Sequence, residues 1–343
     1  MQLRPVRPGE KRPTIRDVAS VAGVSRGTVS RVLNGGDRVS PEAQEAVERA
    51  IAETGYTANH AARTLALGRS NTVAFLLSEP QHILFEDPTF ARLMGGCTRA
   101  LAEHGMLLTL VTAGTPADRE RAVGYVASQH VDGVLLASSH AVDPVAEELI
   151  ATGVPTVVCG RFPGLEARIS MVGADDLDGG RQMTQHLIAR GSRKIAHITG
   201  QMDTPGGFGR LEGYKQALTA AGLPVRPELI VHGDYSRESG EAGMRALLEM
   251  TPDLDGVFVA SDLMAAGACA VLRENGRRIP DDVRVGGFDD AGVAEHLDPG
   301  LSTMRQPFER ISREMVRLLL ARIDGEGDAS VFLPSTLVQR AST

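Results

Sequence analysis

Short apolar runs alternate with amphipathic segments from residue 71 to the C-terminus. The apolar runs are residues 73–77, 107–112, 133–137, 154–158, 195–199, 229–231, 256–260 and 283–287. Helix-like segments such as 91–104, 181–190 and 211–221 lie between them. This alternation predicts parallel strands covered by helices on both faces. The stretch is longer than one such sheet usually holds, so we expect two doubly wound parallel-sheet subdomains with a ligand cleft at the carboxyl ends of their strands.

The segment before residue 71 predicts three short helices. Thr14, with Asp17 three residues later, is a typical N-cap, and Gly23 is expected to end this first helix. Ser25 would cap a second helix that ends before an Asn-Gly-Gly run, and Ser40 would cap a third. Two helices joined by a tight glycine turn indicate a helix-turn-helix.

The second helix of this head carries the candidate DNA contacts. Its apolar residues are expected to face the small core, which leaves a polar face for DNA made of Arg26, Gly27, Thr28, Ser30 and Arg31. Arg26 has the fork geometry that pairs with guanine in the major groove. A glycine inside a helix costs about 1 kcal/mol against alanine, so Gly27 suggests a close approach to DNA.

The charge of −7 is unevenly distributed along the chain. Residues 1–70 hold eleven basic and seven acidic side chains, whereas the remainder holds 25 basic and 36 acidic ones. A basic head on an acidic body suits a polyanion that is contacted at one end. The chain has no run of about 18 apolar residues and no secretory leader, so we expect a cytoplasmic protein without membrane contact.

Three sequence segments of the head carry a family resemblance. They read TIRDVA from Thr14, AGVS from Ala22 and TVSRVLN from Thr28. Together they resemble the DNA-binding head of the LacI/GalR transcriptional repressors. The resemblance implies a helix-turn-helix domain over residues 14–56 and adds Thr14, Ser25 and Asn34 to the DNA contacts.

Residues 57–70 form an alanine-rich segment that is too short to hold a helix alone in water. The segment resembles the hinge helix of the same family, which folds when two subunits sit on an operator. The resemblance assigns Leu65 as the wedge inserted into the minor groove, with Asn59 and Ala62 as further DNA contacts. Such a wedge unstacks one base step and bends the site toward the protein.

The body resembles the periplasmic-binding-protein-like core of these repressors. The resemblance implies an N-subdomain of about 71–172 and 304–325 and a C-subdomain of about 173–303 and 326–343. It also implies a homodimer, with the helix from about residue 87 to 104 at the interface. The matching effector contacts are Ser78, Glu79, Phe85, Arg161, Arg210, Ser261, Asp262, Phe288, Asp289 and Gln306. Arginine and carboxylate groups suit neighbouring sugar hydroxyls because each offers two hydrogen bonds.

Several segments of the body are similar to those of cellobiose-responsive members of the family. The bias of 33 arginines to three lysines is typical of GC-rich bacteria, where such members occur. The resemblance implies a repressor of sugar-utilisation genes that binds a palindromic operator and is released by cellobiose or a cello-oligosaccharide. Another oligosaccharide, a β-glucoside, or a ligand that acts as corepressor remains an alternative.

Two other classes of protein fit the sequence less well. Gly23 to Gly27 matches the GxSxG pattern of hydrolases, but helices flank it on both sides, whereas a nucleophile elbow follows a strand. No Walker lysine, dinucleotide fingerprint or zinc spacing is present, so we expect no enzyme activity and no cofactor. A free-standing transport protein for sugars would need a signal peptide and would have no use for residues 14–70.

Overall fold

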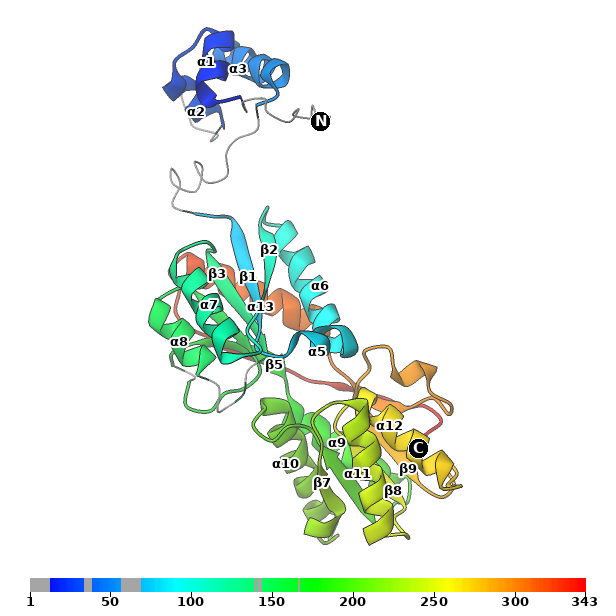
Figure 1. Ribbon diagram of the computed structural model, residues 1–343. Helices are drawn as coiled ribbons and strands as arrows, with labels where there is room; N and C mark the ends of the chain where they lie inside the picture. The colour runs from blue at the N-terminus through cyan, green and yellow to red at the C-terminus, as the bar shows by residue number, and fades with distance from the viewer. Residues whose placement is uncertain (1–12, 34–38, 57–68, 139, 141–143, 166) are drawn as a thin grey trace. The chain divides into compact units, whose positions relative to one another are not determined.

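The computed structural model describes residues 13–33, 39–56, 69–138, 140, 144–165 and 167–343. The chain divides into two compact units, a head within residues 1–70 and a body of residues 71–343. Each unit has its own hydrophobic core. Figure 1 shows that the described part of the head is helical and that the body contains both strands and helices.

The head is a bundle of three helices, α1 (Ile15–Ala22), α2 (Arg26–Leu33) and α3 (Pro41–Thr54). The backbone N–H of Thr14 donates to Asp17 at 2.7 Å, and Gly23 ends α1 with φ 66°. The N–H of Thr28 donates to Ser25 Oγ at 3.1 Å, which caps α2. The buried core is Val18, Ala19, Val29, Val47 and Ala50. The predicted helix-turn-helix is therefore confirmed, with its predicted caps.

The first subdomain of the body is built on a six-stranded parallel sheet in the order β11-β5-β4-β3-β1-β2. Its strands are β1 (Thr72–Leu77), β2 (Leu107–Thr112), β3 (Gly133–Ser138), β4 (Thr156–Cys159), β5 (Ser170–Ala174) and β11 (Ser330–Leu333). Helices α6 (Pro88–Ala102) and α13 (Phe308–Ile323) cover one face, and α7 (Pro116–Ala127) and α8 (Val145–Thr152) the other. The short helix α5 (Gln81–Glu86) precedes α6.

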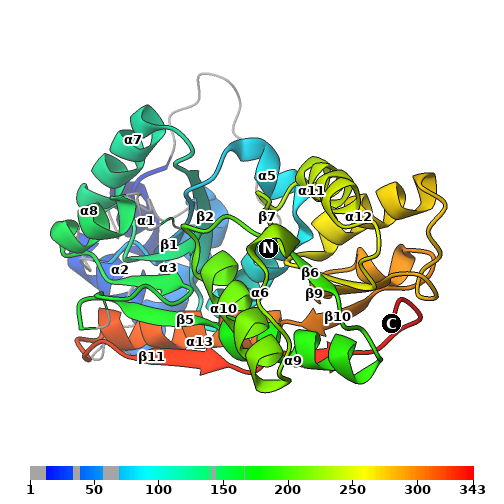
Figure 2. The ribbon, with the colours of Figure 1, turned by 90° about the horizontal axis from the view of Figure 1, so that it is seen from below.

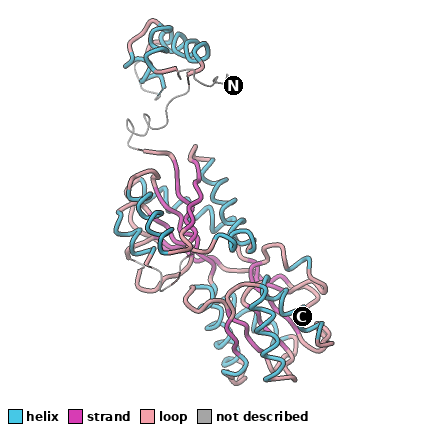
Figure 3. The backbone as a smooth tube through the Cα atoms, viewed as in Figure 1, coloured by secondary structure: helices cyan, strands magenta, loops and turns pink. Residues whose placement is uncertain are grey.

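The second subdomain repeats this plan with the order β12-β10-β9-β8-β6-β7, in which β12 alone is antiparallel. Its strands are β6 (Ile195–Thr199), β7 (Ile230–His232), β8 (Gly256–Val259), β9 (Arg284–Asp289), β10 (Ser302–Arg305) and β12 (Thr336–Val338). Helices α9 (Asp176–Ala189) and α10 (Pro205–Ala220) cover one face, and α11 (Arg237–Met250) and α12 (Asp262–Glu274) the other. Figure 3 shows both sheets enclosed by helices, as predicted.

The chain passes between the subdomains three times, and one predicted boundary is wrong. The crossings follow β5, β10 and β11. The sequence-based boundary assigned everything after residue 325 to the C-subdomain, but β11 pairs with β5 in the first sheet (Figure 2). The third crossing therefore lies between Leu333 and Thr336. The apolar residues of β11 complete the edge of the first core, which places this strand there.

Helices α9 and α10 cross at a contact that only glycine allows. A Cβ on Gly213 would lie 2.2 Å from the carbonyl oxygen of Leu177, and one on Gly180 would lie 2.4 Å from that of Arg210. The backbones therefore touch directly, which fixes α10 against the start of α9. This contact matters for the site because α10 carries Arg210 and α9 begins with Asp176.

We expect Gly213→Ala to lower the free energy of unfolding of the body by about 2 kcal/mol or more, because its Cβ forces the two helices apart. The matched control is Gly124→Ala in α7, where no atom lies within 4 Å of a Cβ. Gly124→Ala is expected to raise the free energy of unfolding by about 0.5–1 kcal/mol, because alanine has the higher helix propensity and the site is exposed. Urea denaturation of both variants measures the difference, and equal effects would contradict the close contact.

Candidate functional site

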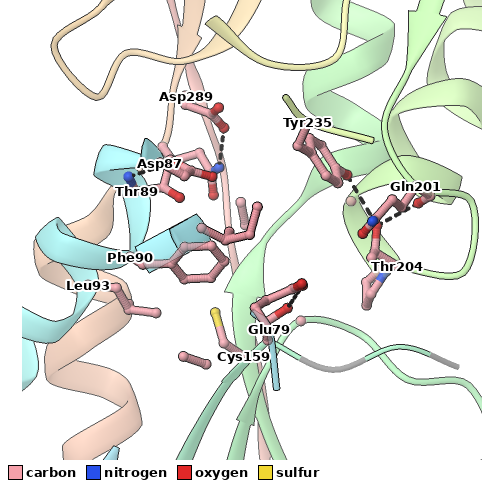
Figure 4. Close-up of a pocket in the computed structure, with 18 of the residues that line it drawn as sticks. Glu79, Asp87, Thr89, Phe90, Leu93, Cys159, Gln201, Thr204, Tyr235 and Asp289 are labelled. Atoms are coloured by element: carbon pink, nitrogen blue, oxygen red, sulfur yellow. Dashed lines mark hydrogen bonds between the residues drawn. The ribbon is translucent and has the colours of Figure 1, made fainter. Parts of the chain in front are cut away.

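A cavity of about 1120 Å³, its mouth included, lies where strands of the two sheets end and face each other. We call it the cleft cavity. The first subdomain contributes Glu79 after β1 and Asp87 and Phe90 around the start of α6. The second subdomain contributes residues after β6, β7 and β9, among them Tyr235 and Asp289 (Figure 4). The position at the carboxyl ends of the strands is the one predicted for a ligand site.

Arg210 lies buried in the wall of this cavity and is only 6% exposed. Its Nε donates to Asp176 at 2.9 Å, Nη1 donates to the carbonyl of Ala260, and Asp289 lies 3.6 Å from Nη1. Its guanidinium carbon lies 3.7 Å from the centre of the Phe288 ring. Burial opposes the charge, but Asp176 and Asp289 outweigh it and raise the pKa of Arg210, so the group is a permanent cation. Neither of these hydrogen bonds uses Nη2, so we expect this nitrogen to donate to a ligand acceptor.

Two carboxyl groups from opposite subdomains face this arginine. Burial raises the pKa of Asp289 well above its ordinary value, Arg210 opposes the rise, and Asp262 and Asp87 add to it. Burial likewise raises the pKa of Asp87, whose carboxylate accepts from the N–H of Thr89 at 2.8 Å. Gln306 donates to Asp289 at 2.7 Å. These groups accept hydrogen bonds from hydroxyls, and in their protonated form they also donate.

A polar row of side chains lines the opposite wall of the cavity. The hydroxyls of Tyr235 and Thr204 lie 3.1 Å apart, and Thr204 donates to the carbonyl of Gln201 at 2.7 Å (Figure 4). Tyr235 has φ 72° and covers Gly200, where a Cβ would lie 2.0 Å from the ring. Burial raises the pKa of Tyr235 to about 12, so its hydroxyl stays neutral. Phe90 faces this row from the first subdomain and supplies an apolar surface.

The structure brings four of the predicted effector residues to the cavity wall: Glu79, Arg210, Asp289 and Gln306. Arg161 lines a neighbouring cavity, where its guanidinium lies 3.7 Å from the Phe332 ring centre. We keep the first four as proposed ligand contacts, because each presents its polar group to the same space.

The other five predicted effector residues are not among the described residues that line this cavity. Ser78 is buried, and Phe85 is 83% exposed on α5. Ser261 caps α12, and Asp262 accepts from Thr303 at 2.6 Å and from the N–H of Asp290 at 2.7 Å. Phe288 lies in the core beneath Arg210. Asp262 therefore supports the turn after Asp289, and Phe288 packs against Arg210, so both act on residues that line the cavity.

Sequence reasoning did not assign Asp87, Asp176, Gln201 or Thr204 as contacts. Asp176 begins α9, two residues after the end of β5, a strand that was not predicted because its sequence contains no long apolar run. Gln201 and Thr204 follow β6, which was predicted, so a search of strand ends could have found both.

The exposed face of α2 matches the predicted DNA-binding residues. Ser25, Arg26, Gly27 and Arg31 are exposed, while Thr28 and Ser30 are half-buried. Arg31 donates to the carbonyl of Gly27 at 3.2 Å, and Thr28 lies 2.9 Å from the Ser25 hydroxyl. Thr14 is exposed at the start of α1. The remaining predicted contacts, Asn34, Asn59, Ala62 and Leu65, lie outside the described residues.

His140 joins the two subdomains beside the cleft cavity. Its Nε2 lies 2.9 Å from Glu79 in the first subdomain, and its Nδ1 lies 3.0 Å from Asp203, which follows β6 in the second. Hydrogen bonding to Glu79 outweighs desolvation and, with the bond to Asp203, raises the pKa of His140 to about 9. The imidazolium therefore donates to one carboxylate of each subdomain at neutral pH.

Among the described residues, none of the helices is both long and apolar enough to cross a membrane. The same part of the chain holds no cluster of three or more side chains that could bind a metal ion.

A DNA-reading head joined to a body with a ligand cleft between two subdomains defines a ligand-responsive transcription regulator. Residues 14–59 match the family model of bacterial regulatory proteins of the lacI family, and residues 184–343 match that of a periplasmic binding protein-like domain. The chain belongs to the LacI family of bacterial transcriptional repressors. The resemblance of the head and the body to this family is thereby confirmed.

The chain is similar to individual members over nearly its whole length. It is 50% identical over 317 residues to the HTH-type transcriptional regulator CelR of Thermobifida fusca, covering 92% of this chain and 93% of the relative. A solved structure of a CelR–cellobiose complex has 47% identity and a TM-score of 0.79, covering 97% and 100% of the two chains. A lac repressor dimer bound to operator and the anti-inducer ONPF has 28% identity and a TM-score of 0.85, covering 97% and 99%.

We expect His140→Ala to lower the melting temperature by roughly 2–4 °C at pH 6, because the bridge between the subdomains is lost. Because folding raises the pKa of His140, the charged imidazolium stabilises the folded protein fully below the ordinary histidine pKa of 6.5. This stabilisation is lost as the pH rises through about 9. The difference from wild type should therefore vanish by pH 10. Asp203→Asn should follow the same pH profile, and His104→Ala on the surface should not. A difference independent of pH would contradict the charged bridge.

Proposed function

We propose that this protein binds an inverted-repeat operator as a homodimer and is released from it by cellobiose or a short cello-oligosaccharide. The observation that carries the proposal is the cleft cavity, in which buried Arg210 and the carboxyls of Asp87, Asp176 and Asp289 converge from both subdomains. Its 50% identity to CelR and its similarity to a CelR–cellobiose complex support the choice of sugar.

The charge of the cavity favours a neutral effector. Six carboxyl groups belong to its described lining, and Arg210 is the one guanidinium among those residues. The carboxyls are Glu79, Glu86, Asp87, Asp176, Asp234 and Asp289. A phosphorylated sugar or a nucleotide would place its anion among these groups at high cost. A neutral oligosaccharide instead donates its hydroxyls to them and stacks on Phe90 and Tyr235.

The dimer would form through the edge of the first subdomain. Strand β2 ends the first sheet, and Leu107 and Leu110 on it are 66% and 40% exposed. Helix α6, the predicted interface helix, packs beside this strand. An exposed apolar edge of this kind is suited to a partner subunit. A second copy would pair two heads for an inverted repeat. The similarity to a lac repressor dimer bound to operator supports this arrangement.

We place the protein in the cytoplasm, where bacterial DNA is reached, and assign it no enzyme activity. The relatives described above are transcription regulators, which supports this proposal. Binding would draw the subdomains together around the sugar and change the spacing of the paired heads. Linkage then requires operator DNA to weaken sugar binding by the same factor. An effector that strengthens operator binding would make the same cleft a corepressor site.

Fluorescence anisotropy on a labelled palindrome from upstream of the protein's own gene tests this proposal. We expect cellobiose to release the bound dimer, whereas maltose and glucose 6-phosphate should not. Tight binding that ignores cellobiose would overturn the choice of sugar, and tighter binding with cellobiose would make it a corepressor. Absence of binding to any palindrome would contradict the inverted-repeat operator.

Two substitutions should separate the two sites. Arg26→Ala is expected to weaken operator binding about 10- to 100-fold without changing cellobiose affinity, because a bidentate base contact is lost. Arg210→Lys keeps the charge but loses the fork, so cellobiose affinity should fall about tenfold or more while operator affinity stays unchanged. Calorimetry and anisotropy measure both, with Arg245→Ala on α11 as a surface control. Loss of both activities in either variant would contradict the separation.

A further inference from the structure

A second cavity of about 1210 Å³, its mouth included, lies beside the cleft cavity. We call it the side cavity. Its walls come from both subdomains: Arg161, Phe162 and Pro163 follow β4 in the first, and Met202 and Phe208 belong to the second. It therefore opens between the same two halves of the body as the cleft cavity does.

The two cavities are neighbouring compartments of one cleft. They share four lining residues, Ala174, Asp176, Thr204 and Pro205. Gly160 lies at this junction, and a Cβ on it would approach Pro205 Cγ to 3.0 Å. A side chain at residue 160 would therefore narrow the passage between the two cavities. Glycine has no side chain, so only its backbone borders this passage. A ligand that occupies the cleft cavity can extend past this point.

The lining of the side cavity has the composition of a sugar-binding surface. Phe208 is 57% exposed, although it sits at the start of α10 between buried Gly207 and Arg210. Met202 and Phe162 extend the apolar surface beside it. The polar groups are those of Arg161, an exposed residue, and the carboxylates of Asp176 and Asp203. A pyranose ring offers one apolar C–H face to an aromatic ring and hydroxyls at its rim to such groups.

We propose that the side cavity is an additional subsite that binds the third glucosyl unit of a β-linked gluco-oligosaccharide. The first two units occupy the cleft cavity, so this inference rests on the proposed function. The third unit stacks on Phe208 and receives hydrogen bonds from the fork of Arg161. The preferred effector is then a trisaccharide or longer chain, and cellobiose fills only part of the cleft.

Calorimetry of the full-length protein with cellobiose and cellotriose tests the subsite. Wild type is expected to bind cellotriose about tenfold more tightly than cellobiose, from burial of one further ring on Phe208. Phe208→Ala and Arg161→Gln should each remove most of this preference and leave cellobiose affinity within about twofold. The matched control is Phe85→Ala, which should keep the preference, because this phenylalanine is also exposed but lies outside the lining of both cavities.

The possible failures can be told apart. Binding of cellobiose with no preference for cellotriose in wild type overturns the subsite and keeps the proposed function. A preference that survives both Phe208→Ala and Arg161→Gln overturns the assignment of the side cavity as its source. Absence of binding by either sugar overturns the proposed function and the subsite together.

Discussion

The ligand cleft depends on one buried cation, the guanidinium of Arg210. Taking this charge out of water costs several kcal/mol, which only well-placed partners offset. Asp176, Asp289 and the carbonyl of Ala260 supply these partners, and the face of Phe288 lies against the guanidinium. Because each partner comes from a different element, the charge can be buried only after α9, α10, β8 and β9 have assembled. The site and the core of the second subdomain are thus one cooperative structure.

A layer of residues that do not face the ligand sets the position of those that do. Asp262 holds the backbone of Asp290 and the hydroxyl of Thr303, which fixes the turn that carries Asp289. Asp289 itself has φ 115°, an unfavourable backbone for a side chain, and this bracing keeps it there. Asp262 and Phe288 resemble ligand contacts in sequence because they accompany the site in the chain, but their effect on a ligand is indirect.

The sequence predicted eight of the twelve described strands and the main helices, because most of these strands contain continuous runs of apolar residues. It missed β5, β10, β11 and β12 as strands. Strand β10 reads STMR and β5 reads SMVGA, so their burial comes from neighbours that their own residues do not reveal. The same limit applies to the site. Arg210 and Asp289 were predicted, whereas Asp176 was not, because it comes just after β5, a strand that the sequence did not predict. Which side chains reach a cavity depends on backbone direction, which spacing alone does not determine.

The charges across the cleft connect ligand binding to closure. Burial raises the pKa of Asp289, and the carboxylate of Asp87 in the first subdomain adds to the rise, because the two carboxylates would repel each other across the cleft. His140 offsets part of this repulsion by donating to Glu79 and Asp203 at one side of the cleft. A sugar whose hydroxyls donate to the facing carboxyls offsets more of it, and only when both subdomains are within reach. The closed state of the body then binds the ligand more tightly than the open state does. Such a difference in ligand affinity between two states is what allosteric control of DNA binding requires.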